Sequence, residues 1–559
     1  MNNTLRDAAL VCAFAFTYGP TYVTAQQPTA RPLRLDSAQV AAWRQDLQYM
    51  AEQMAQRHKN LYHSVSPAAF DSAVAALDRR IPSLARHRVI VEMARIVALV
   101  GDGHTNIAPT RDPKIGFRTL PIRLYFFKEG LFVRAADSAH AGLAGSRVVR
   151  IGRATPEQAY AKVRELVGRD NEMDARFFAP FLLSMPEVLQ AVGVVDDLER
   201  VAFTLERAGR LSTVTLHPAG SAPMMPSDTD VSWWPDSGWV DMRDARVHPP
   251  LWLSRDPRKQ YWFEYLPQAH LVYLQFNKVG NQEGETLADF SRRLLSFVDT
   301  AAVERLVLDL RLNRGGNGSF NRPLLLSLIK ARRLEGNGRL FILIGRSTFS
   351  AAQFMVNQLE QYTDAVFVGE PSGGKVNSYG DSRKIVLPNS GITVRVSTLW
   401  WQEDPRDNRQ WKAPDIAAEL TAAEYRTNVD PALDAVLGYR PEQPVAELMA
   451  RALATGGVDG AIRRYREYRA DPRHAYVDTE DELNILGYRL LGEQRYGQAI
   501  PILELNAAEH PRSANVYDSL GEGYMLAGKP ALAIRNYRKS LALDPSNENA
   551  RSMLDKLGR

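Results

Sequence analysis

The sequence predicts an α/β domain that lies between a helical N-terminal region and an all-α tail of repeats. Three observations support this fold class. Short β-rich runs alternate with helical stretches over residues 261–437, apolar residues recur at helical spacing over 37–100, and the C-terminal segment repeats itself. A chain of 559 residues is also too long for one hydrophobic core, so we expect several domains.

The composition is that of an ordinary soluble protein, with 45% hydrophobic and 24% charged residues. The net charge of +5 is small for this length, and basic residues are mixed with acidic ones. We therefore expect no nucleic-acid partner. The sequence contains no cluster of metal-ligating residues, and we expect no cofactor and no metal.

Residues 1–25 predict a secretory signal peptide. Arg6 precedes an apolar run over 8–17, and small residues stand before Gln26. This run is too short to span a bilayer, which needs about 20 apolar residues. The only cysteine, Cys12, lies within the signal, so the mature chain has no disulfide and no thiol nucleophile. We expect an exported protein, periplasmic or secreted, with no membrane span once the signal is removed.

Residues 26–115 are predicted to be helical and to end in a turn, 101–105, that contains His104 between glycine and threonine. A small mixed module is expected over 116–220. Its elements are three strands at 120–127, 131–135 and 147–151 and a helix near 156–166. Residues 221–255 are rich in Pro, Ser, Asp and Trp without a clear period, which predicts a linker.

The α/β domain is predicted over residues 256–440. Its expected strands lie at 272–276, 305–310, 340–345 and 365–369, and its expected helices at 287–298, 322–330 and 351–361. Three tryptophans near its end, Trp400, Trp401 and Trp411, are compatible with a core, with the rim of a site or with a substrate contact.

The tail, residues 441–559, repeats with a period of 34. Gly487, Ala499 and Pro511 recur as Gly521, Ala533 and Pro545. This is the period of tetratricopeptide repeats, in which small residues let paired helices approach closely. Stacked pairs form a concave surface, so we expect the tail to bind a protein partner rather than to take part in catalysis.

Ser350 and Lys375 stand 25 residues apart and are the first candidates for chemistry. Ser350 follows a predicted strand and begins a predicted helix, whose free N–H groups stabilise negative charge. A serine hydroxyl needs a base to act as a nucleophile, and a desolvated lysine can serve as one. The ordinary alternative is that Ser350 only caps the helix.

A glycine-rich turn follows the strand that ends near Asp309. The backbone N–H groups of Gly315 and Gly316, together with that of Ala351, fit an oxyanion hole. A phosphate-binding loop is the rival interpretation, but the turn lacks the Gly-Lys-Ser/Thr ending of such loops.

These motifs resemble those of the C-terminal processing peptidases, also called tail-specific proteases. The matching segments are Asp309-Leu310-Arg311 with Asn313 and Gly315-Gly316, then Thr348-Phe349-Ser350-Ala351-Ala352, Gly374-Lys375, Pro414-Asp415-Ile416 and Asp430-Pro431-Ala432-Leu433. The resemblance implies a crotonase-like α/β catalytic domain with a PDZ-like module that holds the substrate near its C-terminus.

The resemblance also implies roles for single residues. Ser350 attacks the peptide carbonyl, Lys375 accepts its proton, and the amides of Gly315 or Gly316 and of Ala351 bind the oxyanion. The chain departs from the family where several members carry a glutamine that orients the lysine, because Tyr379 stands at that position.

A second base competes with Lys375. The segment Asp102-Gly103-His104-Thr105 resembles the one that supplies a histidine base in the related tricorn proteases. Histidine titrates near neutral pH and needs little desolvation to be a base. The sequence alone favours Lys375 and leaves His104 open.

We thus expect an exported serine endopeptidase that cleaves polypeptides near their C-termini. The alternative is a catalytically inactive scaffold of the same fold that binds peptides. A third class, an acyl-thioester enzyme, shares the crotonase-like fold but acts on cytosolic substrates, which argues against it here.

Overall fold

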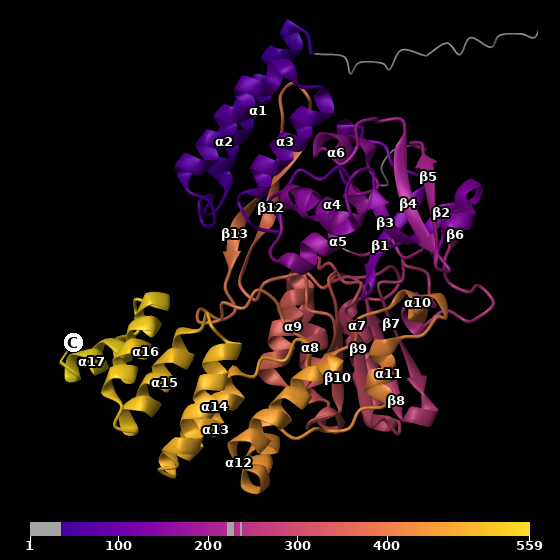
Figure 1. Cartoon of the computed structure of the whole chain (residues 1–559). Coiled ribbons are helices and arrows are strands. Elements are labelled where there is room, and N and C mark those ends of the chain that lie inside the picture. The colour runs from indigo at the N-terminus through magenta and orange to yellow at the C-terminus, as the bar shows by residue number, and fades with distance from the viewer. Residues whose placement is uncertain (1–34, 221–228, 235–236, 559) are drawn as a thin grey trace, which may run out of the picture.

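A computed structural model describes residues 35–220, 229–234 and 237–558. The predicted signal peptide and Cys12 lie outside these residues. Figure 1 shows a main body, built from residues up to about 440, and an arm of paired helices that ends at the C-terminus. Within the described ranges, no helix is both long enough and apolar enough to cross a membrane.

A six-stranded sheet forms the centre of the α/β half of the body. Its order is β14-β11-β10-β9-β8-β7, and all strands except β7 run parallel. The strands are β7 (Tyr261–Leu266), β8 (Leu271–Phe276), β9 (Arg305–Asp309), β10 (Leu340–Ile344), β11 (Val366–Gly369) and β14 (Ile416–Ala417). β8 and β10 are buried along their whole length, as expected of parallel strands covered on both faces.

Helices cover one face of this sheet. They are α7 (Leu287–Thr300), α8 (Asn321–Lys330) and α9 (Ala351–Tyr362), which share a core with Ile342 and Ile344 of β10. The alternate residues Phe341 and Leu343 face a second core on the other side, which includes α10 (Ala422–Arg426) and α11 (Pro431–Leu437). The predicted strands and helices of this domain are confirmed, with ends shifted by one or two residues.

The described residues of the segment predicted to be a linker, 229–234 and 237–255, are more structured than the composition indicates. Trp233, Trp252 and Leu253 are buried in the core under the central sheet. A short strand, β6 (Trp239–Asp241), pairs with β2 of the neighbouring module. The sequence does not indicate this packing, because its Pro and Ser residues interrupt any regular spacing of apolar side chains.

The second module contains an antiparallel sheet of order β1-β2-β3-β4-β5. Its strands are β1 (Ile122–Phe127), β2 (Gly130–Asp137), β3 (Arg147–Ile151), β4 (Val201–Arg207) and β5 (Arg210–Leu216), and its helices are α4 (Pro156–Val163), α5 (Glu172–Leu182) and α6 (Pro186–Ala191). The three predicted strands and the predicted helix are confirmed. Its likeness to a PDZ domain stays a prediction.

A long hairpin joins the half of the body that contains the six-stranded sheet to the N-terminal helices. β12 (Ser378–Val386) and β13 (Thr393–Trp401) run up along α1 (Ser37–Arg57), α2 (Pro67–Arg80) and α3 (Arg86–Ala98) (Figure 1). The buried carboxylate of Asp46 in α1 accepts the backbone N–H groups of Asn389 and Ser390 at the hairpin turn, both at 2.8 Å. Apolar residues of the hairpin belong to the same core as the helices.

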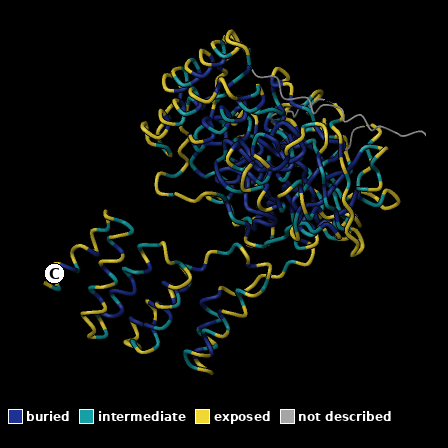
Figure 2. The backbone as a smooth tube through the Cα atoms, turned by 45° about the horizontal axis from the view of Figure 1, so that its top comes forward, coloured by how far each residue is buried: buried dark blue, intermediate teal, exposed yellow. Residues whose placement is uncertain are grey.

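The tail consists of paired helices, as its period predicts. They are α12 (Val445–Ala470), α13 (Glu480–Gly492), α14 (Tyr496–Glu509), α15 (Ala514–Leu526), α16 (Pro530–Leu543) and α17 (Glu548–Lys556). The pair α13 and α14 recurs 34 residues later as α15 and α16. The tail has its own core, and its helices show buried and exposed residues in alternation (Figure 2).

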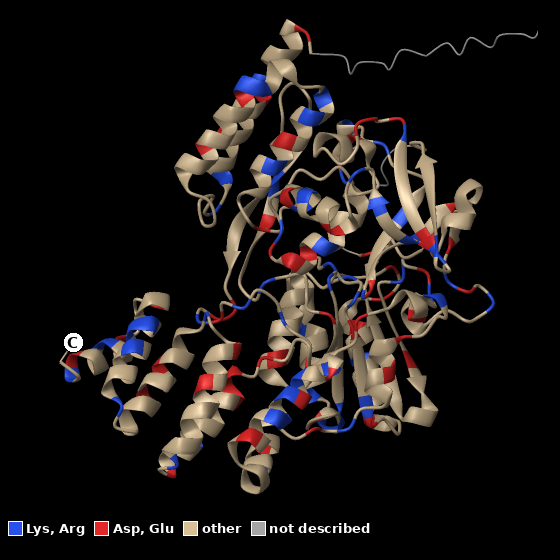
Figure 3. Cartoon of the chain, in the orientation of Figure 1, with Lys and Arg blue, Asp and Glu red and all other residues tan. Residues whose placement is uncertain are grey.

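Charges of both signs are interspersed over the body and the tail (Figure 3).

The hydroxyl of Tyr476, just after the first tail helix, donates to Glu419 next to β14. This contact attaches the tail beside β14, an edge strand of the central sheet.

Candidate active site

Ser350 stands between β10 and α9 in a strained backbone conformation. Its φ of 54° and ψ of −125° are unusual for a residue with a side chain. Its hydroxyl does not cap the helix, which rules out the ordinary alternative for this serine. Instead, Ser350 Oγ lies 3.0 Å from Nε2 of His104, within hydrogen-bond distance. A strained turn between strand and helix is a known way to expose a nucleophile.

His104 reaches Ser350 from the turn that follows α3. Its ring stacks on Phe349, with the ring centroids 4.6 Å apart. Nδ1 is buried and has no hydrogen-bond partner among the described residues, while Nε2 faces the serine. Burial lowers the pKa of His104 to about 4, since desolvation disfavours the imidazolium. The ring is therefore neutral at pH 7, and with its proton on Nδ1 it accepts the Ser350 hydroxyl at Nε2.

Two buried carboxylates hold the backbone of the His104 turn. Asp102 Oδ1 accepts the N–H groups of His104 at 3.0 Å and of Thr105 at 2.8 Å. Asp170, from the module that contains α5, accepts the N–H of Gly103 at 2.8 Å. These three bonds fix the turn on both sides of His104, so the position of the ring depends on residues from two separate parts of the chain.

Asp102 is in turn held by side chains from both ends of the body. Its Oδ2 lies 2.9 Å from Nε2 of His58, and its Oδ1 accepts the hydroxyl of Ser397 in β13 at 2.7 Å. Burial alone would raise the pKa of Asp102, but the hydrogen bonds from His58 and Ser397 outweigh burial and lower it. The carboxylate is thus ionised and acts as an acceptor for the turn.

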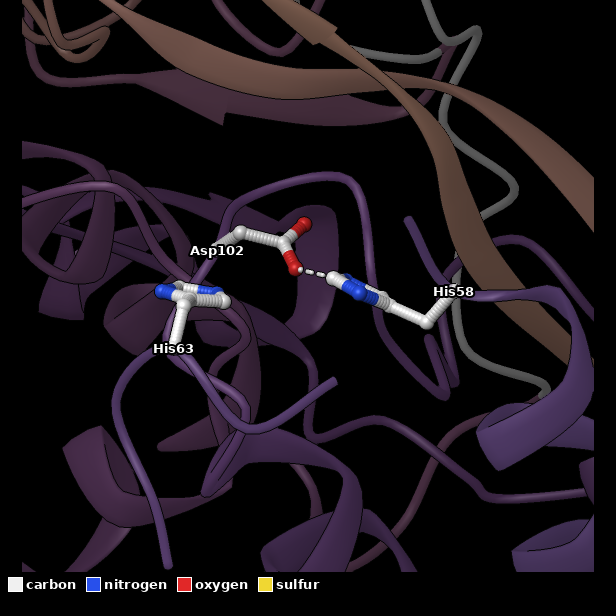
Figure 4. A group of neighbouring side chains, drawn as sticks. All are labelled: His58, His63 and Asp102. Carbon is white, nitrogen blue, oxygen red and sulfur yellow. Dashed lines mark hydrogen bonds and ion pairs between the residues drawn. The ribbon is translucent and has the colours of Figure 1, made fainter. Parts of the chain in front are cut away.

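His58, His63 and Asp102 are neighbours beside this turn (Figure 4). One potential ligand atom of each lies within 4.8 Å of those of the other two, so the three residues could hold a metal ion. Nε2 of His63 is buried without a partner among the described residues. However, Nδ1 of His58 accepts the N–H of Asn60 at 3.0 Å, so Nε2 holds the ring proton and donates it to Asp102. A metal at Nε2 would displace this proton and the Asn60 bond. The observed bonds therefore indicate that His58 and Asp102 support the His104 turn rather than bind a metal ion.

Lys375 lies beside the site, but its ammonium group does not contact Ser350 through any hydrogen bond found in the described residues. The backbone N–H of Lys375 points to Asp170 Oδ2 at 3.4 Å. Burial raises the pKa of Asp170 to about 6, and the charge of Lys375 partly opposes this effect. The structure thus brings Ser350 together with His104, and places Lys375 near the carboxylate that holds the His104 turn.

The glycine turn lies directly against Ser350. The N–H of Gly315 donates to Asn313 Oδ1 at 2.9 Å, so this amide is already used. In the described part of the chain, the N–H groups of Gly316 and Ala351 have no acceptor. A Cβ at position 315 would lie 2.8 Å from Ser350 Cβ and 2.9 Å from the Ala351 nitrogen. The two free amides therefore flank the serine, as an oxyanion hole requires.

Sequence reasoning missed the supports of the site. Asp102 was visible next to His104, but its partners His58 and Ser397 are 44 and 295 residues away in the sequence, and the second carboxylate of the turn, Asp170, is 68 residues away. A buried aspartate in a glycine turn was the only local signal.

No protein-family model matches the chain, and no curated protein matches it. Solved structures do. Mature CPAF matches with 13% identity and a TM-score of 0.51 over 71% of this chain and 96% of that chain. Mature CPAF complexed with lactacystin matches with 12% identity and a TM-score of 0.50 over 71% of this chain and 99% of that chain. The photosystem II D1 C-terminal processing protease covers 74% of this chain and 98% of its own at 14% identity, with a TM-score of only 0.32. The chain therefore has the fold of mature CPAF, and this likeness supports the resemblance of its motifs to the C-terminal processing peptidases.

Proposed function

We propose that this protein is a serine endopeptidase in which Ser350 is the nucleophile and His104 is the general base. The observation that carries the proposal is the 3.0 Å distance between Ser350 Oγ and His104 Nε2. This distance lies within the range that a proton transfer needs. The protease fold of the structural neighbour supports the same class of enzyme.

The reaction begins when Ser350 Oγ attacks the carbonyl carbon of the scissile peptide bond. As the new C–O bond forms, the serine proton passes to His104 Nε2. The carbonyl oxygen becomes an oxyanion, which the N–H groups of Gly316 and Ala351 stabilise. Because these donors are backbone groups at fixed positions, they need no reorganisation as the charge develops.

The tetrahedral intermediate then breaks down. His104 Nε2 donates its proton to the leaving nitrogen, the C–N bond breaks, and an acyl-enzyme remains on Ser350. A water molecule gives a proton to His104 and attacks the acyl carbon. The ester bond breaks, the proton returns to Ser350 Oγ, and the carboxylic acid product leaves.

His104 replaces Lys375, which the sequence favoured, as the proposed base. Burial keeps the imidazole neutral at pH 7, which a base requires. We assign to Lys375 a supporting role, since its positive charge lies near Asp170 and favours the ionised form of the carboxylate that accepts the Gly103 amide.

The finer parts of the proposal rest on the sequence. Cleavage near the C-terminus of the substrate and a PDZ-like substrate module follow from the family resemblance. Export follows from the predicted signal peptide, and a protein partner for the tail follows from its repeats. The alternative of an inactive scaffold has no observation in its favour, because nucleophile, base and free oxyanion amides occur together.

Labelling with a fluorophosphonate probe tests the proposal. The probe phosphonylates a serine only when a base activates it, so we expect the full-length protein to be labelled and Ser350→Ala not to be labelled. His104→Ala should lower the labelling rate by about 100- to 10,000-fold, the contribution of a general base. Lys375→Ala should stay within about tenfold of the natural protein, since no hydrogen bond found among the described residues joins its side chain to Ser350 or His104.

The matched control for Ser350→Ala is Ser212→Ala, which removes an exposed hydroxyl on β5 far from the site. Absence of labelling in the natural protein at every pH would refute the peptidase. A loss in Lys375→Ala with labelling retained in His104→Ala would instead return the role of base to the lysine.

A further inference from the structure

The strand β13 leaves large apolar side chains exposed beside the catalytic pair. Leu399 is 45% and Trp401 is 40% exposed, whereas Ile385, Val394 and Val396 of the same hairpin are buried. Residues two apart on a strand point to the same face. Leu399 and Trp401 therefore share one face with their cross-strand partners Gly380 and Ser378.

Contacts with both catalytic elements place this face at the site. The rings of Trp401 and Phe354 have centroids 5.7 Å apart, and Phe354 lies one helical turn after Ser350, whose carbonyl accepts its N–H at 3.2 Å. A Cβ on Gly380 would lie 3.2 Å from Trp401 Cδ1 and 3.9 Å from His104 Cε1. Trp401 thus lies between the helix of the nucleophile and the ring of the base.

The indole of Trp401 is held in place by a hydrogen bond to the neighbouring strand. Its Nε1–H donates to Asp381 Oδ2 at 2.7 Å, from the neighbouring strand. The polar atom of the side chain is therefore satisfied, and the apolar ring surface remains available. A side chain fixed in advance loses little conformational entropy when a ligand packs on it.

From these contacts we propose that Phe354, Leu399 and Trp401 form an apolar shelf that binds a large apolar side chain, preferably aromatic, of the polypeptide substrate next to the scissile bond. The proposal rests on the proposed function, since the shelf would position a bond for Ser350. Its continuity with Ser350 and His104 identifies the substrate as the occupant rather than a second copy of the chain.

Trp400 provides an internal contrast on the same strand. It is 39% exposed, close to the value for Trp401, but it points to the opposite face and packs on Tyr379 with ring centroids 4.5 Å apart. Tyr379 in turn packs on His63, with ring centroids 4.3 Å apart, away from the serine. Trp400 is therefore a matched control in residue type, exposure and position.

Cleavage of an internally quenched peptide library by the full-length protein, with products mapped by mass spectrometry, tests the shelf. We expect Phe, Tyr, Trp or Leu at one fixed position within two residues of the cut. For a peptide with Phe at that position and a twin with Ala there, the natural protein should prefer Phe by about tenfold or more in kcat/KM. Trp401→Ala should reduce this preference to about twofold or less, whereas Trp400→Ala should retain it.

Three results would overturn the shelf. They are cleavage with no apolar preference near the cut, a preference that survives Trp401→Ala, and an equal loss of preference in both tryptophan variants, which would indicate a general effect on the hairpin. The fluorophosphonate probe separates this failure from that of the proposed function. A protein that is labelled at Ser350 but shows no preference lacks the shelf, and a protein that is not labelled lacks the peptidase activity itself.

Discussion

The two halves of the candidate site are built in different ways. Ser350 and the amides of Gly316 and Ala351 come from strand ends and turns of one sheet, within 36 residues of chain. His104 comes from a turn outside that sheet. This turn is held by the carboxylates of Asp102 and Asp170, and Asp102 is in turn held by His58 and Ser397. The nucleophile is thus positioned by local backbone geometry, whereas the base is positioned by long-range contacts.

This difference shows where the site can be adjusted. A change in the serine half must alter the backbone of the central sheet, whose inner strands β8, β10 and β11 are buried along their whole length. A change in the histidine half needs only a shift of the hairpin or of the N-terminal helices. Removal of each half in turn, and then of its supports, tests the comparison.

The largest effect is expected from the base itself. His104→Ala should lower kcat/KM for peptide cleavage by about 100- to 10,000-fold, because Ser350 loses its proton acceptor. Thermal unfolding measured by circular dichroism should show that the variant still folds. A loss of less than tenfold in a folded variant would contradict the assignment.

The oxyanion turn should come next. In Gly316→Ala, the new Cβ would lie 2.1 Å from the carbonyl oxygen of Val279, so the backbone must shift and the amide must turn away from the substrate. Loss of one oxyanion donor typically costs about 100- to 1,000-fold in kcat. Steady-state kinetics measures this loss, and a kcat within threefold of the natural value would show that Gly316 is not a donor.

The pH dependence of the labelling rate tests the histidine half of the site without a mutation. Burial lowers the pKa of His104 from 6.5 to about 4, so the base stays neutral as the pH falls and is lost only when the pH passes through about 4. The rate of fluorophosphonate labelling should therefore decline near pH 4 rather than near 6.5. A decline at or above pH 6.5 would contradict a buried neutral histidine.

The same shift links pH to stability. Because the unfolded chain protonates this histidine near pH 6.5 and the folded chain only near 4, the contribution of His104 to stability is complete above 6.5 and is lost as the pH falls toward 4. Circular dichroism at each pH shows whether a decline in labelling precedes acid unfolding.

A support of the base should have a smaller effect. In Asp102→Asn, an amide N–H₂ would face the Nε2–H of His58, and the other ring nitrogen of His58 is already occupied by Asn60. We expect kcat to fall by about tenfold with KM nearly unchanged, because the His104 turn shifts while the substrate surface remains.

The control for this variant is Asp299→Asn, which alters an exposed carboxylate at the end of α7. If Asp102→Asn changed KM and left kcat unaltered, the carboxylate would act on substrate binding instead of on the position of the base.

The same contrast explains what the sequence could predict. The strands and helices around Ser350, and the glycine turn with Gly315 and Gly316, follow from local apolar periods and turn residues, and they lie where predicted. The choice between Lys375 and His104 could not be made in this way. The choice of base depends on the hairpin that extends from the sheet to α1. No local pattern in the sequence reveals that Asp46 in α1 accepts the backbone N–H of Asn389 at the hairpin turn.

The tail should have the smallest effect on catalysis, since it has a core of its own and its contact at Glu419 lies beside the edge strand β14. Gly487 in α13 contacts α14 so closely that a Cβ would lie 2.4 Å from Leu503 Cδ2. Gly487→Ala should force these helices apart and destabilise the tail by about 1–3 kcal/mol, as overpacking does. Hydrogen exchange should then speed up in α13–α16 only, while fluorophosphonate labelling of Ser350 stays within twofold of the natural rate. A large drop in labelling would show that the tail holds the active site together and does not serve mainly to bind a partner.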